Sequence, residues 1–271
     1  MPIGEIFSIG VAAIGLIFLY NWYARLNGVA SLDSSPIRRN NMPFFLPFAA
    51  MMLWLMLSVA ISPVADFIGH GKDEWVGEFA IYVLSILVST AMLVCFLLAA
   101  NRFFVCGLKG FGLDRRTIKR DIGAAFVNYI AVMPLIIVGL QAVMMVGKLI
   151  YGDDFQMTQH ESLSVMSGDS PVLLRAAAVM LAVIIAPVFE EVLFRGLFQS
   201  SIASFTSRPW FSIAVTSLFF VMLHPPKHWP ALFALSMCMG YTYERSGSLY
   251  RAIFVHMIFN SVSTAATLLS S

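Results

Sequence analysis

The stretch MLAVIIAPVFEEVLFRGLFQS, residues Met180–Ser200, decides how this chain folds. It is long enough to cross a lipid bilayer as a helix, which takes about 20 predominantly apolar residues. Three charged residues, Glu190, Glu191 and Arg195, nevertheless fall inside it. Because a charge near the bilayer centre costs about 2.5 to 3.5 kcal/mol on insertion scales, such residues normally face a partner or a cavity.

The spacing of these charges predicts two different tasks. Glu191 and Arg195 are four residues apart with the acid first, so they can pair on one helix face. Glu190 lies about 100° further around the helix and is left for another contact. Pro187 removes a backbone donor just before the acids and predicts a kink there. The alternative interpretation is an ion pair that only helps helices to pack.

The rest of the chain is apolar as well. Of its 271 residues, 59% are hydrophobic and 12% are charged, and the mean hydropathy is +0.82. We predict an all-α, polytopic transmembrane helix bundle of about eight spans. The expected spans are 4–24, 43–64, 79–100, 122–147, 171–196, 210–224, 230–245 and 251–269.

The loops predict an orientation in the membrane. Most of the 17 basic residues lie after the first, third, fifth and seventh spans, which places those loops in the cytoplasm and both termini outside. The connector Gly107–Asp121 is one of these basic loops, and its cations can meet anionic lipid head groups. The alternate loops are acidic, including the one that holds Asp154, Glu161 and Asp169. A net charge of +2 and the lack of a phosphate-binding loop motif predict no nucleic-acid partner.

Two further motifs lie in the last spans. FVMLH, Phe220–His224, and HMIFN, His256–Asn260, each place two residues four apart on one helix face. A lone histidine is usually structural, but two histidines and a glutamate pair on three apolar helices predict one shared polar centre. That centre could hold a metal through imidazole and carboxylate, or let a carboxylate deprotonate water directly. Asn260 could position an oxyanion or orient His256.

One distance restricts this convergence. His224 lies about 20 Å beyond Phe211 along an ideal helix. We therefore expect the sixth span to be tilted or to begin deep in the membrane.

Together, EEVLFR, FVMLH and HMIFN resemble the EExxxR, FxxxH and HxxxN/D motifs of the CAAX protease and bacteriocin-processing family. These intramembrane proteases are also called the Abi or type II CAAX prenyl endopeptidase family. The resemblance covers about residues 171–265, so we divide the chain into N-terminal helices, 1–170, and a catalytic core, 171–271.

The resemblance implies a role for each motif residue. Glu190 would activate the hydrolytic water with help from His224, and Glu191 and Arg195 would shape the site. His256 and Asn260 would bind a metal or stabilise the oxyanion, and Phe220 would contact the substrate. If the metal is zinc, its ligands would be Glu190, His224 and His256.

The predicted function is hydrolysis of a peptide bond in a membrane protein or peptide, by an enzyme of the cell membrane, a prokaryotic inner membrane. The sequence makes no prediction about prenylation of the substrate or about oligomeric state. One alternative is a catalytically silent scaffold or a bacteriocin-immunity protein. A transporter with a proton relay is a third class, but the first four spans hold almost no interior ionisable residues to form one.

Overall fold

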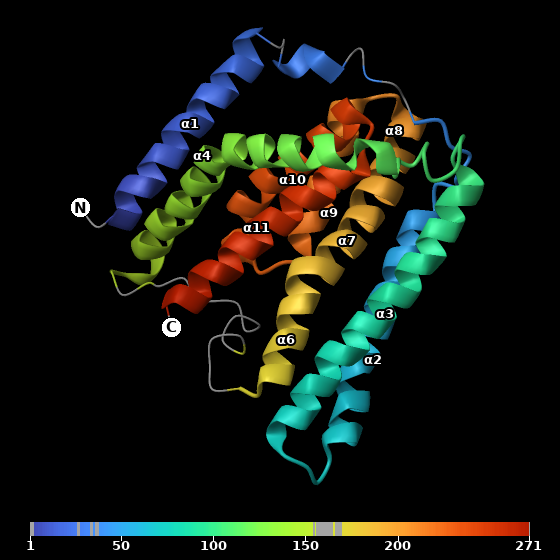
Figure 1. Ribbon diagram of the computed structural model, residues 1–271, viewed down its shortest axis with the longest axis vertical. Helices are drawn as coiled ribbons and strands as arrows, with labels where there is room; N and C mark the ends of the chain where they lie inside the picture. The colour runs from blue at the N-terminus through green and yellow to red at the C-terminus, as the bar shows by residue number, and fades with distance from the viewer. Residues whose placement is uncertain are drawn as a thin grey trace.

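The structure is a computed structural model that describes residues 3–25, 28–32, 35, 38–153, 155, 165 and 170–270. Asp154, Glu161 and Asp169 of the expected outer loop lie outside the described residues. The described part is helical and its only strand-like pairing is a single antiparallel bridge between Asn40 and Phe104, so the predicted all-α class is confirmed. Its elements are α1 Ile3–Arg25, η1 Gly28–Leu32, α2 Leu46–Gly69, α3 Glu74–Phe103, η2 Arg115–Thr117, α4 Ile118–Tyr151, α6 Val172–Met180, η3 Leu181–Ile185, α7 Ala186–Glu191, η4 Val192–Gln199, α8 Ser200–Thr206, α9 Pro209–Met222, η5 Pro226–His228, α10 Trp229–Ser246 and α11 Leu249–Ser270 (Figure 1).

Each of the eight expected spans forms a helix, and five helical stretches are long and apolar enough to cross a membrane. These five are Leu46–Gly69, Glu74–Phe103, Arg115–Tyr151, Val172–Thr206 and Leu249–Leu269. By this criterion the count of eight is not confirmed, because Gly10–Ala24 of α1 and the 14 residues of α9 count only as shorter apolar helices and α10 does not reach the required hydropathy. The five helices indicate a multi-pass membrane protein.

The span Val172–Thr206 is one continuous helix with two wider, π-helical segments, Leu181–Ile185 and Val192–Gln199. The glutamate pair ends the short α-helical piece between them. In the first π segment the N–H of Ala186 bonds to the carbonyl of Leu181, five residues back. The next carbonyl, Ala182, would need an N–H from residue 187, which is a proline and has none. π segments are rare and often occur at functional sites.

Helix α4 is bent, and Pro134 lies inside it (Figure 1). Its first half crosses the bundle, and its second half turns to run along α1. Two glycines permit close packing: a Cβ on Gly15 of α1 would lie 2.4 Å from the carbonyl oxygen of Ile130, and one on Gly139 would lie 2.8 Å from the backbone nitrogen of Ala231. Helix α4 thus joins α1 to α10.

The basic connector is fixed to the C-terminal helices. Phe111 is fully buried, and its ring lies against Gly196, where a Cβ would come within 2.1 Å of it. Gly112 adopts a φ of 103°, and its carbonyl accepts a hydrogen bond of 2.9 Å from the N–H of Leu249. Asp114 then caps η2, and the bonded side chain of Arg116 lowers the pKa of Asp114 to about 2. Phe111 and Gly112 therefore anchor the connector to the packed core, whereas most of its cations stay exposed.

Candidate active site

Helices α7 and α11 bring two glutamates and a histidine together. The Nδ1–H of His256 donates to Oε1 of Glu191 at 2.9 Å, since a carboxylate can only accept. The other ring nitrogen, Nε2, lies 3.9 Å from Oε2 of Glu190. The imidazole therefore lies between the two carboxylates, and its geometry leaves Nε2 facing Glu190.

The two glutamates differ in burial and in partners. The side chain of Glu191 is fully buried, whereas that of Glu190 is 18% exposed. In both residues Oε2 is buried and has no hydrogen-bond partner among the described residues, so the difference in partners lies at Oε1 of Glu191, which accepts from His256. Buried polar atoms are nearly always bonded, so an oxygen without a partner inside an apolar helix needs an explanation. Glu190 also lies near the middle of the span Val172–Thr206.

Arg195 forms the predicted ion pair and makes a further contact that the motifs did not indicate. Its Nη1 donates to Oε1 of Glu191 at 2.8 Å, the oxygen that His256 also uses. Its Nη2 donates to Oγ of Ser236 at 2.7 Å and to the carbonyl of Ser236 at 3.2 Å. The guanidinium carbon lies 4.8 Å from the ring centre of Phe220. Arg195 is fully buried and therefore depends on these partners.

Ser236 belongs to a polar row on α10 that sequence reasoning missed. One turn further on, Nε2 of Gln199 donates to the carbonyl of Gly240 and to Oε2 of Glu244, which also accepts from Arg38 at 2.9 Å. Positions 195 and 199 thus face 236, 240 and 244 with the same four-residue spacing. This shared spacing was the sequence signal that could have predicted the contact between the two helices. It is a weak signal, because serine and glycine are common in apolar helices where they make no such contact.

The second motif is grouped around Phe220. Its ring is fully buried and lies 4.7 Å from the ring of His224 and 5.8 Å from that of His256. The Nδ1–H of His224 donates to the carbonyl of Phe220 at 2.8 Å, and Trp229 Nε1 donates to the carbonyl of His224. His224 is half-buried and reaches the others through Phe220. Its joint action with Glu190 on one water, and substrate binding by Phe220, stay predictions.

Asn260 is committed to the backbone. Its Nδ2 donates to the carbonyl of Ala182 at 2.7 Å, the group that Pro187 leaves without a backbone donor. The third motif therefore ties α11 to the π segment that precedes the glutamates. Stabilisation of an oxyanion by Asn260 stays a prediction, for which its second amide hydrogen is available.

The described site residues do not provide the ligand set of a catalytic zinc ion. A catalytic zinc site uses three protein ligands and an open position. Glu190 and His256 approach each other, but no three His, Cys, Asp or Glu side chains in the described ranges lie close enough to hold one ion. This arrangement does not fit the three-ligand zinc site, and zinc binding stays a prediction.

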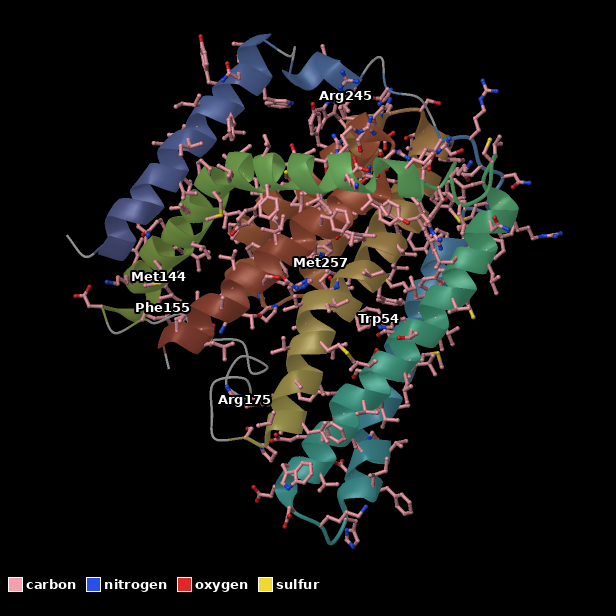
Figure 2. All side chains as sticks on the ribbon, in the orientation of Figure 1. Trp54, Met144, Phe155, Arg175, Arg245 and Met257 are labelled. Atoms are coloured by element: carbon pink, nitrogen blue, oxygen red, sulfur yellow. The ribbon has the colours of Figure 1, made fainter. Side chains whose placement is uncertain are left out.

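The site is enclosed by aromatic side chains and lies in the middle of the bundle. Phe189, which precedes the glutamates, is packed between Trp54 of α2 at 5.4 Å and Phe96 of α3 at 5.7 Å. Figure 2 places Trp54 on the side of α2 that faces the bundle and Met257, the neighbour of His256, at its centre. The N-terminal helices therefore help to position a site whose charged residues all come from the C-terminal part.

A known protein family matches the segment that holds the motif residues. A family model described as type II CAAX prenyl endopeptidase, Rce1-like, matches residues 172–262, about a third of the chain. No curated protein and no solved structure matches. All six polar motif residues, from Glu190 to Asn260, lie within the matched segment. Residues 172–262 thus carry the sequence pattern of Rce1-like type II CAAX prenyl endopeptidases, and the resemblance predicted from the three motifs is confirmed.

Proposed function

We propose that this chain is an intramembrane endopeptidase in which Glu190 activates water. The single observation that carries the proposal is the Oε2 atom of Glu190, a buried acceptor without a partner, 3.9 Å from Nε2 of His256. Oε2 of Glu191 is also a buried acceptor without a partner among the described residues, but Glu191 is bound through Oε1 to both Arg195 and His256. We therefore assign the role of base to Glu190, which makes neither of these bonds. The family match supports CAAX-type proteolysis as the general activity.

In the proposed reaction, Glu190 takes a proton from water while the water oxygen attacks the carbonyl carbon of the peptide bond. His224 would orient this water through its free Nε2, since its Nδ1 is bonded to Phe220. The negative charge that develops on the carbonyl oxygen would be met by the second amide hydrogen of Asn260. His256 would add a donor at Nε2 only as the imidazolium, because the Nδ1–H is already bonded to Glu191. Glu190 then returns its proton to the leaving amine as the C–N bond breaks.

The remaining charged residues would keep this geometry in place. Glu191 holds His256 by Nδ1, which fixes the ring so that Nε2 faces Glu190. Arg195 holds Glu191 and is itself held by Ser236. Because side chains that are fixed in advance cost no reorganisation during the reaction, this chain of contacts favours catalysis over a simple packing role.

The substrate would be a membrane-associated protein or peptide, because the reactive groups lie in the middle of a membrane span. Cleavage of a prenylated C-terminal segment is the specific form of the proposal. It rests on the description of the matching family and on no contact within this chain.

The test is cleavage of fluorogenic peptides, prenylated and unprenylated, by the purified protein in liposomes. Glu190→Ala and His256→Ala should abolish cleavage, whereas Glu78→Gln, an exposed glutamate of α3, should leave it unchanged. Cleavage unaffected by both site substitutions would refute the assignment. If no peptide of a broad panel is cleaved while the folded protein binds one of them, a silent scaffold is the better description.

A chelator in the same assay tests zinc separately. The described geometry leads us to expect cleavage to survive chelation, since Glu190 and His256 lack a third ligand within reach. Loss of activity that added zinc restores would show instead that the ligands rearrange around an ion.

A further inference from the structure

A buried carboxylate at the start of α4 has no part in the proposed reaction. Asp121 is fully buried and lies within the span Arg115–Tyr151. A carboxylate in such a place is costly unless donors surround it. Its Oδ2 accepts a hydrogen bond of 2.5 Å from the hydroxyl of Ser248, and its Oδ1 accepts from Nη2 and Nε of Arg251 at 2.9 and 3.2 Å. Both oxygens of Asp121 are therefore bonded to residues at the beginning of α11.

The connector adds further contacts to the same end of α11. The N–H of Leu249 donates to the carbonyl of Gly112 at 2.9 Å. The hydroxyl oxygens of Thr117 and Ser248 lie 3.5 Å apart, at the limit of a hydrogen bond. The connector, which precedes the matched segment 172–262, thus binds the first turn of α11, which lies inside that segment.

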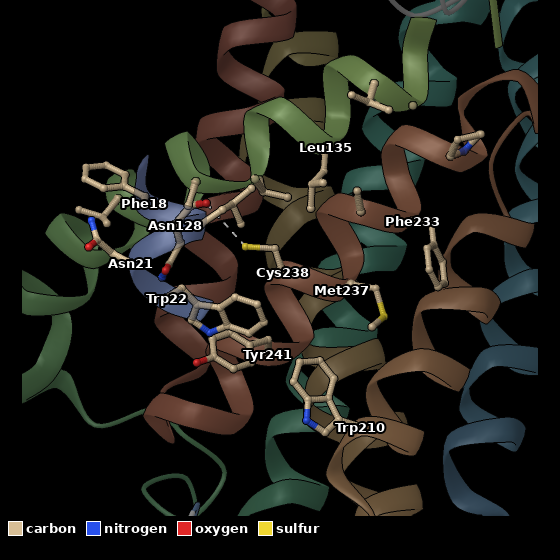
Figure 3. Close-up of a pocket in the computed structure, with 18 of the residues that line it drawn as sticks. Phe18, Asn21, Trp22, Asn128, Leu135, Trp210, Phe233, Met237, Cys238 and Tyr241 are labelled. Carbon is tan, nitrogen blue, oxygen red and sulfur yellow. Dashed lines mark hydrogen bonds between the residues drawn. The ribbon is translucent and has the colours of Figure 1, made fainter. Parts of the chain in front are cut away.

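The helix that carries Asp121 is itself held by its neighbours. Ala125, one turn after Asp121, is fully buried. Further along, the thiol of Cys238 in α10 donates to the carbonyl of Asn128 at 3.7 Å (Figure 3). Because α10 packs against this part of α4, Asp121 lies on a fixed support and can resist a rotation of α11.

His256 lies between two anchors on α11. Arg251 is five residues before it, and Asn260, which is bonded to the π segment before the glutamates, is four residues after it. Five residues correspond to about 7.5 Å along the helix and about 140° around it. Asp121 therefore holds α11 from the side of α4, while His256 faces Glu191 on a different side of the helix.

A small rotation of α11 is enough to disturb the histidine. A side-chain atom about 6 Å from the helix axis moves by about 1 Å when the helix turns by about 10°. A movement of this size away from Glu191 would take the 2.9 Å contact with Nδ1 of His256 beyond hydrogen-bonding distance. A misplacement of about 1 Å, caused by a substitution outside the reacting groups, can lower a rate by about 100-fold. The rotation of α11 is thus part of the catalytic geometry.

We propose that Asp121 is a positioning residue for His256. Through its bonds to the first turn of α11 it sets the rotation and the height of that helix. The imidazole then meets Glu191 with one nitrogen and faces Glu190 with the other. This role rests on the proposed function, because it assumes that His256 takes part in the reaction. It gives the connector, which lies outside the matched family pattern, a task in the same site.

The test observes His256 directly by NMR, in the full-length protein in detergent micelles with nitrogen-15 in its histidines. A buried, hydrogen-bonded Nδ1–H exchanges slowly with water, so it gives its own resonance, which is identified by its loss in His256→Gln. Asp121→Asn keeps the shape of the side chain and removes its charge. In this variant we expect the resonance to shift by more than its linewidth or to lose at least half of its intensity. An unchanged resonance would overturn the proposal.

Asp114→Asn is the matched control for this experiment. Asp114 lies in the same connector and accepts from Nη2 of Arg116 at 2.9 Å, the distance of the bond between Asp121 and Arg251, but its pair is exposed. It should leave the resonance of His256 unchanged. Equal shifts in Asp114→Asn and Asp121→Asn would mean that any change in the connector disturbs the histidine, which would contradict a specific role for Asp121.

Peptide cleavage provides a second measurement. Asp121→Asn should lower kcat per folded molecule by about 10- to 100-fold and change KM by less than about threefold, because a reacting group is displaced and substrate contacts are not. Gly15→Ala strains a different contact, since its Cβ would lie 2.4 Å from the carbonyl oxygen of Ile130 in α4. It should reduce the folded fraction without lowering kcat per folded molecule. The same pattern in Asp121→Asn would show that Asp121 only stabilises the protein.

Arg251→Lys covers the case in which Asp121→Asn does not fold. Lysine keeps a counter-charge for Asp121 but replaces two fixed donors with one flexible ammonium group, so this variant should fold and still disturb the resonance of His256. An undisturbed resonance here would also refute the positioning role. The resonance is observed whether or not a peptide is cleaved. A wild type that cleaves no peptide therefore counts against the proposed function, and an undisturbed resonance counts against this role alone.

Discussion

Nδ1 of His256 lies 2.9 Å from Oε1 of Glu191, and the same oxygen accepts from Arg195 at 2.8 Å. Oε1 of Glu191 thus accepts hydrogen bonds from His256 of the last helix and from the buried Arg195 of the same helix. The other glutamate, only one position away, holds neither. We therefore expect substitution of Glu191 and substitution of Glu190 to have opposite effects on stability and on activity.

Glu191→Gln should unfold more readily than wild type. The amide leaves the buried guanidinium of Arg195 without its counter-charge, and breaking a buried pair in this way costs about 3 to 5 kcal/mol. Denaturant unfolding in detergent, followed by circular dichroism, measures the change. A loss below about 1 kcal/mol would mean that Ser236 alone satisfies Arg195.

Glu190→Gln should show the reverse pattern. Its Oε2 makes no hydrogen bond within the described residues, so stability should change by less than about 0.5 kcal/mol. Removing a general base lowers the rate by about 10² to 10⁴. Unfolding and peptide cleavage are measured on the same preparation. A destabilised but active protein would exchange the roles that we assign to the two glutamates.

Ser236→Ala tests the contact that the motifs did not indicate. Loss of a hydrogen bond to a charged group costs about 1.5 to 3 kcal/mol, and cleavage should slow because Arg195 no longer fixes Glu191. Ser212→Ala is the matched control, since Ser212 is equally buried but its hydroxyl donates to the carbonyl of Pro209 in its own helix and, among the described residues, not to the site. Equal effects of both variants on cleavage would remove Ser236 from the site.

Asn260 and Pro187 should be energetically coupled through the carbonyl of Ala182. Asn260→Ala leaves that carbonyl unpaired, at about 1 to 3 kcal/mol. In a Pro187→Ala background the new N–H can take over, so the same substitution should cost about 1 kcal/mol less. A double-mutant cycle on unfolding free energies measures the coupling. Additivity within about 0.5 kcal/mol would rule it out.

Gly196→Ala should strain the contact with the connector. The added Cβ would lie 2.1 Å from the ring of Phe111, and such overpacking costs about 1 to 3 kcal/mol. Shortening Phe111 to leucine in the same protein should recover part of the loss. Unfolding curves of the two single variants and the double variant provide the measurement. If the double variant is no better than the sum of its parts, the ring is not what resists the methyl group.

Local pattern was enough to predict the helices and the motif pairs. The apolar runs predicted every span that folds as a helix, because burial in a membrane and helical hydrogen bonding act on each segment separately. The four-residue spacing likewise predicted the bond between Glu191 and Arg195. Both depend on neighbours along one helix.

Contacts between different helices could not be predicted from patterns along a single helix. The partnership of Arg195 with Ser236 depends on how α10 is rotated, and the burial of Phe111 depends on a connector that reads as an exposed basic loop. The crossing half of α4 follows from its bend, which apolar periodicity does not reveal. The capping of Ala182 by Asn260 needed the backbone pattern around Pro187.

The burial of Phe111 against Gly196 also limits which substitutions this protein can accept at these two positions. The segment that carries the family pattern shares its hydrophobic core with the connector and with α4, so it is not a separate folding unit. If residues 172–262 were transferred alone into another membrane protein, Gly196 would lose the ring of Phe111 that packs against it. A bulkier residue at position 196 needs a smaller one at position 111, so we expect substitutions at these two positions to be coupled.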